Sequence, residues 1–64
     1  MRHTEFWSRM EAALGPAYSR HWASHHVLAE LGGHTVEESL ADGTPPKQVW
    51  RAVWAALGLP ASER

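Results

Sequence analysis

The chain has 64 residues, which is enough for one small domain, and it contains no cysteine that could cross-link the fold or bind zinc. Six Lys or Arg stand against seven Asp or Glu, and the formal net charge of -1 argues against a generally basic nucleic-acid-binding surface. No apolar run reaches the ~18 residues of a membrane helix and the N-terminus lacks a signal-peptide core, so we expect one cytoplasmic domain over residues 1–64 without membrane contact.

Tryptophan is unusually frequent for so short a chain. The four tryptophans all lie on apolar stripes with helical spacing: Trp7, Trp22, Trp50 and Trp54. Large aromatic side chains bury the most area for each residue that folding must order, and a small domain without disulfides depends on them. We therefore expect these indoles to form the core before they serve any ligand.

The first expected helix covers residues 4–14, with the hydroxyl of Thr4 as its N-terminal cap. Its apolar residues recur every three or four positions and define one buried face. They are Phe6, Trp7, Met10, Ala13 and Leu14. Gly15 suits the left-handed end of this helix and Pro16 suits the first position of the next, so the two helices should meet in a tight corner.

The second expected helix covers residues 16–31, but its apolar residues change face along the way. They form two groups on nearly opposite sides: Tyr18, Trp22 and Ala29, and Val27 and Leu31. Either the helix breaks around residues 24–26 or it stays whole and is buried on two sides. We favour a continuous or slightly kinked helix, because neither Gly nor Pro interrupts it before Gly32 and Gly33 end it.

The third expected helix is short and has the clearest start in the chain. Thr35 and Glu38 have the spacing of a capping box, in which each residue hydrogen-bonds the backbone of the other. The helix should end at Asp42 and Gly43.

A fourth helix should follow Thr44, because Pro45 and Pro46 are tolerated in a first turn that lacks intrahelical acceptors. Its buried stripe consists of Val49, Trp50, Val53, Trp54 and Leu57. Leu59 should fold back onto the last turn, and residues 61–64 should form a frayed tail. No strand pattern is visible, so the expected fold is all-α, a small orthogonal bundle of four helices.

Six short motifs along the chain together resemble an actinobacterial family of small proteins, the domain of unknown function 3046. They are TEFW at 4–7, LGPAY at 14–18, HVL at 26–28, ELGG at 30–33, TVEE at 35–38 and VWRAV at 49–53. The resemblance covers nearly the whole chain and implies a helical protein without an assigned activity. Family genes often neighbour that of the RecA recombinase, which implies a link to DNA repair. The chain departs from the family pattern at His3, His21, 24–25 and 44–46.

Two histidines are the strongest candidates for a metal site. His21 and His25 lie four residues apart on one helical face, with His26 beside them. A stable zinc site needs three or four ligands, and no cysteine or inward carboxylate completes this set. We therefore expect neither a metal nor another cofactor.

The third and fourth expected helices have the order of a helix-turn-helix, in which the second helix enters the DNA major groove. The polar residues available on that helix are Lys47, Gln48 and Arg51. Two prolines occupy its N-terminal end, and acidic residues on the preceding helix would repel phosphates. DNA binding is therefore the alternative function and not the favoured one.

No enzyme is expected, because the chain lacks a nucleophile elbow, a phosphate-binding loop and a metalloprotease helix, and no catalytic residue is assigned.

A protein-interaction adaptor or regulator fits the composition best, since a small bundle with four tryptophans leaves indoles exposed beside arginines, as in binding hot spots. The candidate interaction surface comprises Trp50 with Arg51, Trp7 with Arg9, and Lys47. A protein is the expected partner.

Overall fold

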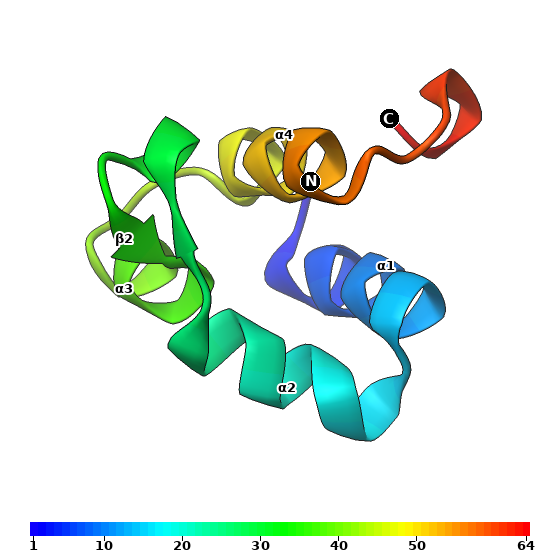
Figure 1. Cartoon of the computed structure of the whole chain (residues 1–64), viewed down its shortest axis with the longest axis horizontal. Coiled ribbons are helices and arrows are strands. Elements are labelled where there is room, and N and C mark those ends of the chain that lie inside the picture. The colour runs from blue at the N-terminus through cyan, green and yellow to red at the C-terminus, as the bar shows by residue number, and fades with distance from the viewer.

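The computed structural model describes all 64 residues and is mostly helical (Figure 1). Its elements, in chain order, are α1 (His3–Leu14), α2 (Pro16–His25), β1 (Val27–Leu28), the 3-10 turn η1 (Ala29–Leu31), β2 (His34–Thr35), α3 (Val36–Ala41), α4 (Pro46–Leu57) and the 3-10 turn η2 (Ala61–Glu63). The four expected helices are present. A two-stranded antiparallel sheet interrupts them, so the fold is not a simple four-helix bundle.

The corner between α1 and α2 forms as expected, although α1 begins differently. The residue before α1 is Arg2, which makes no side-chain cap, and Thr4 lies inside the helix, so the expected Thr4 cap is wrong. Gly15 donates its N–H to the carbonyl of Glu11 at 2.8 Å, but its φ of 89° and ψ of 153° lie outside the left-handed helical conformation expected there. Pro16 then opens α2 directly, and α2 packs against α1.

The expected continuous helix over residues 16–31 is wrong, because α2 ends at His25. Val27 pairs with Thr35 and Leu28 with His34 in an antiparallel register. In an extended strand neighbouring side chains point to opposite sides, so Leu28 is buried while Val27 remains 56% exposed. The change of apolar face in the sequence therefore marks a strand and not a kinked helix.

Gly32 and Gly33 turn the chain between β1 and β2. Gly32 lies in the left-handed region with a φ of 71°, and Gly33 donates its N–H to the carbonyl of Leu28 at 3.1 Å. A residue with a Cβ is strained in that conformation, which explains the glycine. We call residues 27–35, comprising β1, η1 and β2, the hairpin.

The capping box at the start of α3 is confirmed. The hydroxyl of Thr35 accepts the N–H of Glu38 at 3.1 Å, and the carboxylate of Glu38 accepts the N–H of Thr35 at 2.8 Å. The pair joins the end of β2 to the first turn of α3, so the helix direction is set by the hairpin.

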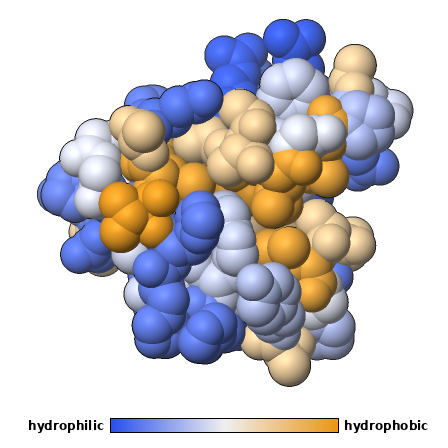
Figure 2. All heavy atoms as spheres, in the orientation of Figure 1, coloured by the Kyte–Doolittle hydropathy of each residue, from blue (hydrophilic) through white to orange (hydrophobic).

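The core lies between α1, α2, the hairpin, the first turn of α3 and α4, and two of the four tryptophans belong to it. Its buried apolar residues are Phe6, Met10, Trp22, Ala23, Leu28, Val36, Val49, Trp50, Ala52 and Val53. Phe6 and Trp50 meet edge to face, with centroids 6.3 Å apart at 85°. Trp7 and Trp54 are only half-buried. Figure 2 shows hydrophobic residues gathered in the middle of one face, over and beneath α4, inside a largely hydrophilic margin.

The C-terminal segment is folded onto α4, so the frayed tail expected at residues 61–64 is not observed. The indole of Trp50 donates to the carbonyl of Glu63 at 2.9 Å, and that of Trp54 donates to the carbonyl of Pro60 at 2.8 Å. Leu59 folds back as expected, with its N–H bonded to the carbonyl of Trp54 at 3.1 Å. None of the helices combines the length and the apolar character that a membrane span requires.

Candidate functional site

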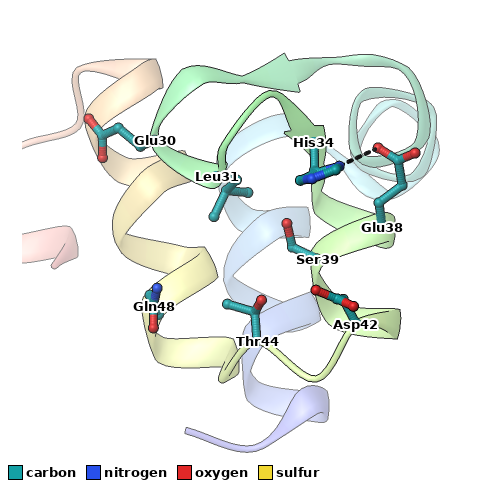
Figure 3. A pocket seen from close by; sticks show the side chains of 8 residues that line it. All are labelled: Glu30, Leu31, His34, Glu38, Ser39, Asp42, Thr44 and Gln48. Carbon is teal, nitrogen blue, oxygen red and sulfur yellow. Dashed lines mark ion pairs between the residues drawn. The ribbon is translucent and has the colours of Figure 1, made fainter.

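The largest hollow in the surface, about 460 Å³ in volume, opens between the hairpin, α3 and the start of α4 (Figure 3). We call it the acidic pocket, because three of its side chains are carboxylates and only one is apolar. Its lining consists of Glu30, Leu31, His34, Glu38, Ser39, Asp42, Thr44 and Gln48. The hairpin, α3, the turn after α3 and the first turn of α4 all contribute to it.

Glu38 joins the acidic pocket to the capping box. The hydrogen bond from the Thr35 N–H stabilises the ionised carboxylate and lowers the pKa of Glu38, outweighing the opposing effect of desolvation. The same oxygen lies 3.8 Å from Nδ1 of His34, as the dashed line in Figure 3 shows. Glu38 therefore stays negative, and its carboxylate already has partners within the chain.

Glu30 and Asp42 differ from Glu38 because neither carboxylate hydrogen-bonds or pairs with any other side chain of the protein. Glu30 belongs to η1 and Asp42 follows the last residue of α3. Both are exposed. These two carboxylates remain available to a ligand.

Ser39 is the buried polar residue of the acidic pocket. The residue is only 5% exposed, but no polar side-chain atom of the chain is both buried and unpaired, so the Ser39 hydroxyl meets the water of the pocket. Figure 3 shows its side chain directed into the space between α3 and α4. The carbonyl of Ser39 accepts the N–H of Thr44 at 3.0 Å, and this bond holds the turn that brings Thr44 to the same space.

Residues 1–62 match the family described as Protein of unknown function (DUF3046). The chain belongs to this family. No curated protein and no solved structure matches it.

The family match spans every residue of the acidic pocket and every residue of the surface predicted from the sequence. In that predicted surface, Trp50 is 1% exposed and cannot contact a partner, so the proposed pairing of Trp50 with Arg51 does not form. Arg51 lies exposed on α4. The guanidinium near Trp50 is that of Arg9, 5.9 Å from the ring centroid.

The second predicted pair, Trp7 with Arg9, is also not formed. Arg20 of α2 covers the Trp7 ring at 3.8 Å. Arg9 instead contacts the Glu5 carboxylate at 3.3 Å and the carbonyl of Arg64 at 3.1 Å. These arginines therefore shield indoles at the edge of the core, which leaves Lys47 and Arg51 as the exposed cations of the predicted surface.

Charge is unevenly divided along this DUF3046 chain. Residues 30–42 contain four carboxylates and no Lys or Arg, whereas the rest of the chain has six Lys or Arg against three Asp or Glu. Residues 30–42 form the end of the hairpin and α3. They therefore contribute most of the residues that line the acidic pocket. These acids were not predicted to form a site, because in the sequence they were interpreted only as an obstacle to DNA binding. The absence of Lys and Arg among residues 30–42 is the signal that could have indicated one.

The histidines in and directly after α2 belong to two separate stacked pairs of rings. The rings of His21 and His25 have centroids 4.2 Å apart at 20°, and Trp22 stacks on His26 at 4.6 Å. Nδ1 of His25 lies 3.0 Å from the carbonyl of His21, which fixes the ring along the helix. No three His, Cys, Asp or Glu side chains gather closely enough to hold a metal ion, and the absence of a cofactor stays a prediction.

Proposed function

We propose that the chain is a small non-catalytic interaction module, an adaptor or regulator, that binds a partner protein through the acidic pocket. The supporting observation is the largest surface hollow, lined by three carboxylates within a segment free of Lys and Arg. Complementary charge guides association and favours one class of partner. The partner surface should therefore be basic.

The state of Glu38 favours binding over catalysis. A carboxyl group that acts as general acid near neutral pH needs a raised pKa. The backbone hydrogen bond from Thr35 lowers the pKa of Glu38 instead. This carboxylate is suited to hold a positive charge and to cap α3, and not to deliver a proton.

DNA binding is the second candidate, and one observation favours it. Lys47 and Arg51 are both exposed and lie one turn apart on α4, so both can reach phosphates. Thr44 and Gln48, however, border the acidic pocket at the N-terminal end of α4, the end that would approach base edges. The carboxylates there would repel the DNA backbone, so a basic protein is the better partner.

Two charge-reversed double variants separate these functions. Glu30→Lys with Asp42→Lys reverses the pocket, and Lys47→Glu with Arg51→Glu is the matched control on α4. Each variant, immobilised, is compared with wild type for the proteins it retains from an extract of the native cells and for DNA retention. We expect wild type and the α4 variant to retain a basic protein, and the pocket variant not to retain it.

Retention that survives reversal of the pocket would contradict the proposal. DNA retention by wild type that is lost in the α4 variant would instead support the second candidate. Circular dichroism of all three proteins checks that the substituted residues, which are exposed, leave the fold intact.

A further inference from the structure

We infer that residues 60–64, which we call the C-terminal strap, occupy a peptide-docking site on α4, and that a proline-containing segment of a partner protein binds there in place of the strap. The site presents the indole N–H groups of Trp50 and Trp54 and the guanidinium of Arg9. None of these residues lines the acidic pocket. The inference therefore concerns a second surface and does not depend on the function proposed above.

The strap is an addition to α4 and not part of the cap that ends it. Gly58 adopts the left-handed conformation after the last residue of the helix, and Leu59 donates its N–H to the carbonyl of Trp54 at 3.1 Å. This bond completes the C-terminal cap. Leu59 also packs against the core, whereas all the residues of the strap are exposed. Short exposed terminal segments open at a lower free-energy cost than the core does, so the strap can leave α4 without uncapping the helix.

The two indoles hold the strap through its backbone. The indole of Trp54 donates to the carbonyl of Pro60 at 2.8 Å, and the indole of Trp50 donates to the carbonyl of Glu63 at 2.9 Å. An indole N–H can only donate a hydrogen bond, and every residue of a peptide carries a carbonyl acceptor. Another segment with the same backbone conformation therefore offers these donors the same acceptors.

Two residues of the strap define the segment that would replace it. Pro60 has a φ of -69° and a ψ of 162°, the polyproline II conformation in which aromatic-lined grooves bind proline-rich segments. The guanidinium of Arg64 lies over the Trp54 ring, 5.3 Å from its centroid, and the carbonyl of Arg64 accepts a hydrogen bond from Arg9 at 3.1 Å. The site therefore fits a segment in which an arginine stands four positions after a proline.

A segment of another protein is favoured over the strap of a second copy. Exchange of straps between two copies replaces each contact by an identical one, so it gains nothing against the freedom lost on association. A partner segment continues beyond both ends of the strap and can add contacts that the strap lacks. The occupant should therefore be a different protein.

The test titrates the full chain with three unlabelled peptides and follows its indole N–H signals by ¹H–¹⁵N NMR. The first peptide, acetyl-Leu-Pro-Ala-Ser-Glu-Arg-amide, has the sequence of residues 59–64. Alanine replaces proline in the second, and the third has the first sequence reversed. The first peptide should shift the indole signals of Trp50 and Trp54 but not that of Trp22, and should move the amide signals of the strap to those of a disordered chain. The second should bind about threefold more weakly, because its φ is not preset, and the third should not bind.

Loosening the strap should strengthen binding of the peptide. Arg64→Ala removes the guanidinium over Trp54 from the strap but leaves the site itself unchanged. Because the peptide competes with the strap, this variant should bind the first peptide about threefold more tightly than wild type does. Arg51→Ala is the matched control, since it removes the same charge from an exposed residue of α4 outside these contacts, and it should bind as wild type does.

Indole signals that do not respond to the first peptide, or that respond equally to the reversed one, would overturn the inference. Equal affinity of Arg64→Ala and wild type would also overturn it, because the strap and the peptide would then not compete for one site. Sedimentation of Arg64→Ala tests the remaining occupant. If the variant formed a dimer in which the strap amides kept their bound positions, the occupant would be a second copy and the assignment to a partner protein would be wrong.

Discussion

The indole N–H of Trp50 donates a hydrogen bond to the carbonyl oxygen of Glu63 at 2.9 Å. The ring that makes this bond is 1% exposed and also packs edge to face on Phe6. One side chain in the middle of α4 thus holds both α1 and the last turn of the chain. Its neighbour Trp54, one turn on, is only half-buried and bonds the carbonyl of Pro60.

Replacing Trp50 should be far more damaging than replacing Trp54. Trp50→Ala should cost about 3–5 kcal/mol through lost burial and a cavity, which is comparable to the whole stability of so small a domain. Trp54→Ala should cost about 1–2 kcal/mol, because part of its ring already faces water. Urea unfolding followed by circular dichroism measures both; similar losses would contradict the ranking.

Deleting residues 61–64 should destabilise the domain. The deletion removes the acceptor of the Trp50 indole and the carbonyl bound by Arg9. Losing this hydrogen bond and exposing part of the Trp50 ring to water should cost about 1–3 kcal/mol, visible as a lower urea midpoint and red-shifted tryptophan fluorescence. Ser62→Ala, an exposed change in the same segment, serves as the control. An unchanged midpoint after deletion would mean that the segment contributes nothing.

Glu38 should contribute to the acid sensitivity of folding. Its pKa is lowered in the folded chain from the ordinary value of a glutamate, chiefly by the backbone hydrogen bond from Thr35. Such a group adds stability that is complete above the unfolded pKa and is lost as the pH falls through the folded pKa. Between pH 7 and pH 3, Glu38→Gln should therefore lose less unfolding free energy than wild type.

Glutamine can still accept the Thr35 N–H, so Glu38→Gln separates the charge from the cap. Urea titrations at each pH give the comparison, with Glu37→Gln as the neighbouring change that removes an equal charge without a capping hydrogen bond. If the unfolding free energies of the two variants depended on pH in the same way, the predicted contribution of the ionised Glu38 carboxylate to stability would be refuted.

Ser39→Ala should leave stability unchanged or raise it by about 1 kcal/mol. Its hydroxyl opens to the water of the pocket and is not a buried unpaired group, so its removal loses no hydrogen bond within the chain, and alanine favours a helix more than serine does. A thermal melt of the free chain measures this. A loss above about 1 kcal/mol would show that the hydroxyl has a structural role within the chain.

Most helices were predictable because their signals are local. The Thr35 and Glu38 pair starts α3, and the apolar stripe that includes Val49 and Val53 identifies α4. The strand at Val27 was not predictable in this way, because its partner Thr35 lies eight residues further on. A short apolar run cannot by itself distinguish a strand from a buried helical turn.

The candidate site was less predictable than the fold. Its carboxylates come from η1, α3 and the turn that follows, and only the hairpin brings Glu30 toward Asp42. The difference in burial between Trp50 and Trp54 was not predictable for a similar reason. Trp50 and Trp54 lie on one helical stripe, yet only Trp50 is covered by Phe6 of α1.

The edge-to-face pair of Phe6 and Trp50 joins helices from opposite ends of the chain. Other helix contacts link neighbours in sequence, α1 with α2, α2 with α3 and α3 with α4. Local pairs can form quickly and independently, whereas closing the long intervening loop carries a larger entropy cost. The docking of α1 onto α4 is therefore the step that should turn fluctuating helices into a cooperative unit and govern the folding rate.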